Sequence, residues 1–163
     1  MKFRWIAALL FSIFGVAIAD SSLSPKQECE TLMNKVLPFA EHMLKREGEF
    51  FPYGGALKNT GDVAEIAGYD GREHPPSMDI IKLIKQGFVA GAESGEYRAT
   101  ALVYDVRVLV PSTGNKSNAI AVSLNHRGNY SVIVFFPYEL KEGELKYGQV
   151  FAQQGESDIF KSH

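Results

Sequence analysis

The sequence has one cysteine and one tryptophan among 163 residues, and only one long apolar run. The single cysteine, Cys29, excludes an internal disulfide bond, so the core alone must stabilise the folded chain. The lack of further apolar runs excludes a protein that crosses a membrane several times. Walker A, GxGxxG, HExxH, GxSxG and paired CxxC motifs are also missing, so we expect no cofactor and no metal ion.

Positive charge is scarce and scattered. The chain carries 17 Lys and Arg against 19 Asp and Glu, and its densest basic cluster is the pair Lys45-Arg46. Nucleic-acid binding needs clustered basic residues, and attachment to a membrane surface needs a basic amphipathic helix. The composition therefore predicts neither partner.

The first nineteen residues have the pattern of a secretory signal peptide. Lys2 and Arg4 precede a 14-residue apolar stretch, and Ala17-Ile18-Ala19 provides a small-x-small cleavage sequence. Cleavage would leave residues 20–163 as a single domain, and loss of the two basic residues would change the formal net charge from −2 to −4. We expect export to the periplasm or the extracellular space, with no membrane attachment after cleavage.

Two amphipathic helices are expected. The first begins with Ser24 as its cap, Pro25 in the first turn and Gln27 in a capping box, and Cys29 lies on its apolar stripe. Cys29 is thus expected to be buried and unreactive, and Pro38 should kink or divide the helix. The second helix begins at Ser77.

Strand patterns fill the rest of the chain. The expected strands are residues 49–57, 63–67, 96–110, 119–126, 130–137 and 145–151. Residues 130–137 are apolar on both faces, which indicates an interior strand. The fold class is therefore α+β: an antiparallel sheet of about five to six strands with two main helices packed on it, in the order α-β-β-α-β-β-β-β.

Three short stretches resemble the signatures of a known group of proteins. Residues 48–54 (GEFFPYG), 104–108 (YDVRV) and 136–138 (FPY) are similar to the GEFFPFG-, DVR- and PY-like signatures of an uncharacterised bacterial family of small proteins. The element order is also similar to that of roadblock and profilin-like domains. The resemblance implies a single domain and brings no activity with it.

The segment before the second helix is the best candidate site. It gathers Tyr69, Asp70, Arg72, Glu73 and His74 ahead of two prolines. Loops on a rigid scaffold often carry function, and Tyr and Arg are common at the centres of interfaces. We expect these residues to contact a partner, and a solvated connector is the alternative.

Asp105 and Arg107 share one face of the long strand. Each is expected to meet an opposite charge across the sheet or to mark a strand end that emerges into water, and the functional alternative is an anion-binding arginine oriented by the nearby acid. His126 ends a strand beside Arg127 and is expected to be exposed at a turn.

Two specific functions remain open from the sequence, besides the more general one of a subunit in a larger assembly that uses an exposed sheet edge or helix face. The first is a non-enzymatic binding or inhibitor protein with a protein partner, for example an immunity protein against a toxin. The alternative is a small exported hydrolase that uses the loop around His74 together with Asp105 and Arg107. The two differ in geometry, because the hydrolase requires the three side chains to meet in one pocket. The sequence leaves the oligomeric state open.

Overall fold

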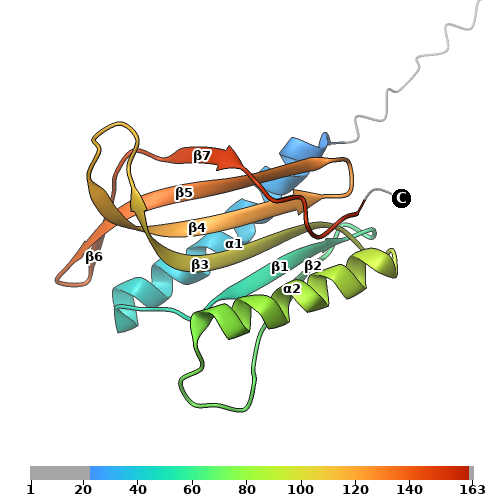
Figure 1. Cartoon of the computed structure of the whole chain (residues 1–163), viewed down its shortest axis with the longest axis horizontal. Helices are drawn as coiled ribbons and strands as arrows, with labels where there is room; N and C mark the ends of the chain where they lie inside the picture. The colour runs from blue at the N-terminus through green and yellow to red at the C-terminus, as the bar shows by residue number, and fades with distance from the viewer. Residues whose placement is uncertain (1–22, 162–163) are drawn as a thin grey trace, which may run out of the picture.

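The computed structural model describes residues 23–161, which form two helices and seven strands (Figure 1). The expected signal peptide lies outside the described residues. Neither described helix is long and apolar enough to cross a membrane. The elements are α1 (Pro25–Glu47), β1 (Tyr53–Lys58), β2 (Val63–Ala67), α2 (Ser77–Glu93), β3 (Tyr97–Leu109), β4 (Lys116–His126), β5 (Tyr130–Lys141), β6 (Glu144–Tyr147) and β7 (Phe151–Gln154).

All strand pairs are antiparallel, and the sheet order is β2-β1-β3-β4-β5-β6. The last strand, β7, pairs with β5 as well, so β6 and β7 follow one another along the same edge of β5. The α+β class with helices packed on an antiparallel sheet is confirmed. The interior position of residues 130–137 is confirmed too, because β5 has neighbours on both sides.

The sheet has one strand more than expected, because the predicted strand 145–151 ends early and a further strand, β7, begins at its last residue and continues to Gln154. Pro137 lies opposite the break and has no N–H to donate to a neighbouring strand. Its carbonyl instead accepts the Gly148 N–H at 2.8 Å. The predicted strand therefore ends at Tyr147, and pairing to β5 resumes at Phe151. Other boundaries differ by several residues as well: β1 begins at Tyr53, β4 begins at Lys116 and β5 continues to Lys141.

Helix α1 begins as its sequence predicts. Ser24 accepts the backbone N–H of Gln27, whose side chain in turn accepts the backbone N–H of Ser24 at 2.9 Å. Pro38 does not divide the helix. The Tyr53 hydroxyl lies beside it, accepts the Ala40 N–H at 3.0 Å and donates to the Val36 carbonyl at 2.6 Å. A phenol from β1 thus bridges the helical turn that contains the proline.

The two helices pack on opposite faces of the sheet. Leu57 lies in the core cluster that contains Cys29 and the buried side of α1, whereas the adjacent Ala56 lies in the cluster that contains Ile84 and α2. Adjacent strand residues point to opposite faces, so the sheet separates two cores. Cys29 has no exposed surface, as predicted. Ile159 in the C-terminal segment is buried against α2.

Candidate functional site

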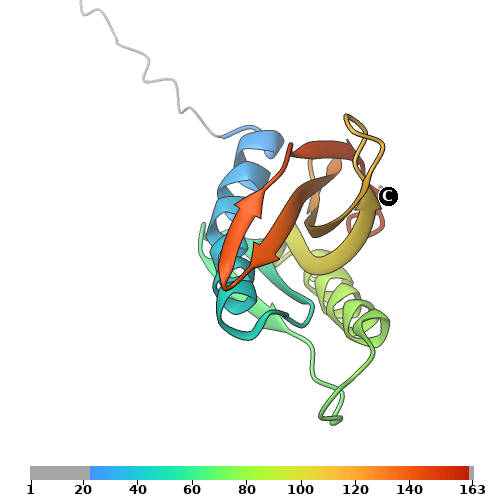
Figure 2. The ribbon, with the colours of Figure 1, turned by 90° about the vertical axis from the view of Figure 1, so that its left-hand side faces the viewer.

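The segment between β2 and α2 protrudes from the body of the protein. Figures 1 and 2 show it extending beyond the sheet and both helices in two perpendicular views. We call residues 69–77, which include Ser77 at the start of α2, the protruding loop. Tyr69 begins it and is 75% exposed, and Met78, which follows it, is 72% exposed. Glu73 and His74 are exposed between them. The loop is thus accessible along its length and bounded by two exposed apolar side chains.

Arg72 orders this loop internally. Its backbone N–H donates to Asp70 Oδ1 at 3.0 Å, its Nε donates to Asp70 Oδ2 at 2.8 Å, and its Nη2 forms ion pairs with Asp70 and with Asp79. The hydrogen bonds from Arg72 lower the pKa of the Asp70 carboxyl, and those to Asp70 and Asp79 raise the pKa of the Arg72 guanidinium. Both groups are charged throughout the physiological range. Arg72 therefore connects the loop to the first turn of α2.

Asp105 and Arg107 lie on the other side of the sheet. Asp105 pairs with Ile120, which belongs to the core under α1, so its side chain lies on the α1 face. Asp105 forms no ion pair with any described residue, and its Oδ1 instead accepts the Tyr138 hydroxyl at 3.1 Å. Desolvation raises the pKa of Asp105, and this hydrogen bond lowers it in part. Arg107 is exposed and has no salt bridge within residues 23–161. Both residues are exposed, which agrees with the alternative of a strand end that emerges into water.

The hydrolase geometry is therefore not assembled. The protruding loop leads into α2 on one face, whereas Asp105 and Arg107 extend from the opposite face. None of the main cavities in the described part of the chain is lined by His74 together with Asp105 or Arg107. Among residues 23–161 there is no cluster of three His, Cys, Asp or Glu side chains that could hold a metal ion.

The sequence interpretation missed a partly buried cluster of charged and polar side chains around Glu28. Its Oε1 pairs with Arg98 Nη2 at 2.9 Å and its Oε2 lies 2.8 Å from His126 Nε2. The expectation of an exposed His126 is wrong, because the residue is 8% exposed. The alternation of side chains along the strand could have predicted this burial. His126 lies on the same face of β4 as Leu124, which belongs to the core under α1.

The hydrogen bonds of His126 define its tautomer. The Gly128 N–H donates to His126 Nδ1 at 2.8 Å, so Nδ1 is an acceptor and carries no proton. The proton of the neutral ring is then on Nε2, from which it is donated to Glu28. Glu28 and Arg98 thus form a charge pair with a neutral histidine attached, and together they connect α1 to the ends of β3 and β4. None of the main cavities among the described residues is lined by Glu28 or His126.

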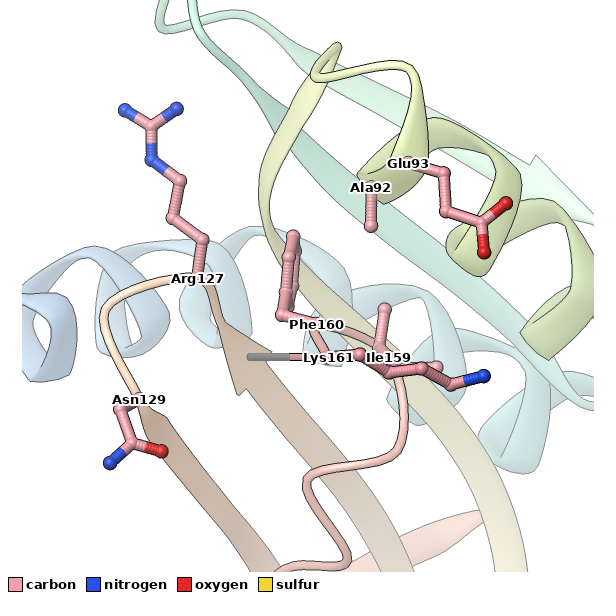
Figure 3. A pocket seen from close by; sticks show the side chains of 7 residues that line it. All are labelled: Ala92, Glu93, Arg127, Asn129, Ile159, Phe160 and Lys161. Atoms are coloured by element: carbon pink, nitrogen blue, oxygen red, sulfur yellow. The ribbon is translucent and has the colours of Figure 1, made fainter. Parts of the chain in front are cut away.

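The cavity in Figure 3 does not collect polar groups. It has a volume of about 250 Å³ and lies between the end of α2, the β4–β5 turn and the C-terminal segment. Figure 3 shows Arg127, Asn129 and Glu93 pointing away from one another, with Phe160 between them. Arg127 is already engaged, since its Nη1 donates to Asn59 Oδ1 at 2.8 Å. A binding site needs convergent polar groups, which this cavity lacks.

Comparison with protein-family models, with curated proteins and with solved structures gives no match for this chain. The resemblance of three short stretches to a bacterial family thus stays a prediction. Any argument about function rests on the surfaces of the molecule itself.

Proposed function

We propose that the protein is an exported, non-enzymatic binding protein whose protruding loop contacts another protein. The observation that carries the proposal is the loop's geometry: residues 69–77 extend from the body between exposed Tyr69 and exposed Met78. A convex element of this kind fits a concave surface, such as the cleft of an enzyme or toxin. An inhibitor, including one of the immunity type, would use the loop in this way.

The construction of the loop supports the proposal on energetic grounds. Binding costs less conformational entropy when a loop is already ordered in its bound form. Pro75 and Pro76 restrict the backbone before α2, and Arg72 holds the loop to Asp70 and Asp79. Because all three charged groups are at the surface, their ion pairs contribute little to global stability. Their role in this proposal is to position Tyr69 and His74.

Export is part of the proposal and rests on the sequence of residues 1–19. If the signal peptide is cleaved after Ala19, N-terminal sequencing of the native protein begins at Asp20. Recovery of the full-length chain from the cytoplasm would contradict this part alone and leave the loop's role open to test.

A pair of photocrosslinking variants tests the loop. A photoreactive phenylalanine replaces Tyr69 in one variant and Leu109 in the other, and both are expressed in the native host. Leu109 is the matched control, since it is 61% exposed at the end of β3 and lies outside the loop. The proposal predicts a defined crosslinked protein at position 69 that is absent at position 109. Equal labelling at both positions, or none at position 69, would reject it.

Substitutions then measure the contribution of the loop. Tyr69→Ala and Arg72→Ala should each weaken binding of the crosslinked protein by at least about 1 kcal/mol and leave the melting temperature nearly unchanged. The hydrolase alternative makes the opposite prediction, namely a measurable turnover that His74→Ala abolishes.

A further inference from the structure

The strand that leads into the protruding loop has a free edge. Among the described strands β2 pairs only with β1, and Figure 2 shows it running beside α1 directly into the loop. The Lys58 N–H donates to the Asp62 carbonyl at 2.9 Å, which fixes the alternation of hydrogen-bonded pairs along the hairpin. By that alternation the backbone groups of Ala64 and Ile66 form hydrogen bonds with β1. The N–H and C=O groups of the other three residues, Val63, Glu65 and Ala67, point away from β1. Within residues 23–161 these outward groups have no hydrogen-bond partner.

The same three residues line an apolar groove against α1. The groove has a volume of about 600 Å³, and its opposite wall is formed by Lys35, Val36 and Phe39 of α1. Phe39 is 52% exposed there. The free backbone groups and the apolar groove therefore belong to one surface. An added strand would form hydrogen bonds with β2 and direct alternate side chains into the groove.

Glu65 determines which strand can bind. Its partner on β1 is Gly55, which offers no side chain to pair with Glu65. No larger residue fits at position 55, since a Cβ there would lie 2.6 Å from Val36 Cγ1. Glu65 also forms no salt bridge with Lys35 across the groove or with any other described residue. Its carboxylate is thus available to a residue on the outer side of β2.

This charge also argues against self-association. Glu65 is the central residue of β2, so antiparallel pairing of two copies centred on it would place two glutamates opposite each other. Like charges directly opposite are destabilising, and charged side chains on edge strands commonly prevent such pairing. A strand with Lys or Arg at that position would instead be stabilised.

We infer that β2 binds an extended strand of a partner protein, with a basic residue opposite Glu65 and apolar residues two positions to either side. The inference deepens the proposed function, because β2 and the protruding loop are separated only by Gly68 and form a continuous surface. One partner can therefore contact both.

A pair of synthetic peptides tests the strand site without the unidentified partner. The first is the capped heptapeptide Thr-Val-Thr-Lys-Thr-Val-Thr, and its matched control has Glu in place of Lys. Both are titrated into ¹⁵N-labelled protein comprising residues 20–163. The lysine peptide should shift the amide signals of Val63, Glu65 and Ala67, and bind about fivefold more tightly than the glutamate peptide. In the Glu65→Lys variant this preference should reverse.

A backbone variant provides a second readout. Ala67→Pro removes one outward N–H and leaves the hydrogen bonds between β2 and β1 intact. It should therefore weaken binding of the lysine peptide, whereas Ala67→Val should not. Equal binding of both peptides, shifts confined to the β6 or β7 edge, or no binding would overturn the inference. Concentration-dependent dimerisation abolished by Ala67→Pro would also overturn it, in favour of a second copy as the occupant. None of these results bears on crosslinking at Tyr69, so the loop proposal can survive the failure of the strand site.

Discussion

Two glycines one turn apart in α2 should respond differently to substitution by alanine. Gly87 is exposed, and a Cβ built on it meets nothing within 4 Å. Alanine is preferred over glycine inside a helix by about 1 kcal/mol, so Gly87→Ala should stabilise the protein by about that amount. Gly91 is buried on the same helix, and its Cβ would overlap the ring of Tyr97 at the start of β3.

Gly91→Ala receives the same gain in helix propensity, so the difference between the two variants isolates the overlap. Inserting a methyl group into a packed site costs about 1–3 kcal/mol. We therefore expect Gly91→Ala to be less stable than Gly87→Ala by about 1–3 kcal/mol in urea denaturation, with the same dependence of the unfolding free energy on urea concentration in both variants. In a Tyr97→Ala background the difference should shrink, since the overlapping ring is gone. Equal stabilisation by both alanines in the native background would refute the packing of α2 against β3.

Three further outcomes follow from the same structure. Tyr53→Phe removes the hydroxyl that bridges Ala40 and Val36, so it should lower the free energy of unfolding in urea by about 1–2 kcal/mol and speed hydrogen exchange at the Ala40 amide. Tyr69→Phe is the control and should change neither. Burial raises the pKa of Cys29 to about 12, so a thiol reagent at pH 8 should label the native protein far more slowly than the urea-unfolded chain, and fast native labelling would contradict its burial. Because the pKa of Asp105 is raised in the folded state, its ionisation destabilises the fold as the pH increases through that pKa. The stability of Asp105→Asn relative to the native protein should thus be higher at pH 7 than at pH 3. A stability difference that does not change with pH would show that desolvation of Asp105 is unimportant.

The sequence predicted the fold correctly where the local preferences of a segment agreed with the way that segment packs in the protein. The capping residues Ser24 and Gln27 began α1 as expected, and the apolar stripe placed Cys29 in the core. Alternation also identified the long strands. The pattern failed near Pro137, because the break between β6 and β7 depends on a residue in another strand that lacks an N–H. A pattern read along one segment contains no information about its neighbour.

The candidate site was predicted only in part. The loop that carries Tyr69 and His74 is exposed and protruding, as a polar segment with two prolines would suggest. Its proposed association with Asp105 could not be tested from the sequence, since it depended on which face of the sheet each segment occupied. The cluster of Glu28, Arg98 and His126 was missed because its members are distant in the sequence and meet only in the fold.

These placements separate the groups that stabilise the fold from those we propose to bind. The Glu28 cluster connects α1 to the strand ends near the β1–β2 turn, where Arg98 Nη1 and Arg127 Nη1 both donate to Asn59. Strand β2 runs away from this turn and leads through Gly68 into the protruding loop, whose ion pairs are all at the surface. Contacts at the surface contribute little to global stability, so substitutions on the outer edge of β2 and in the loop can change binding while the fold persists. The separation is what allows the crosslinking, peptide and loop variants to report on binding and not on unfolding.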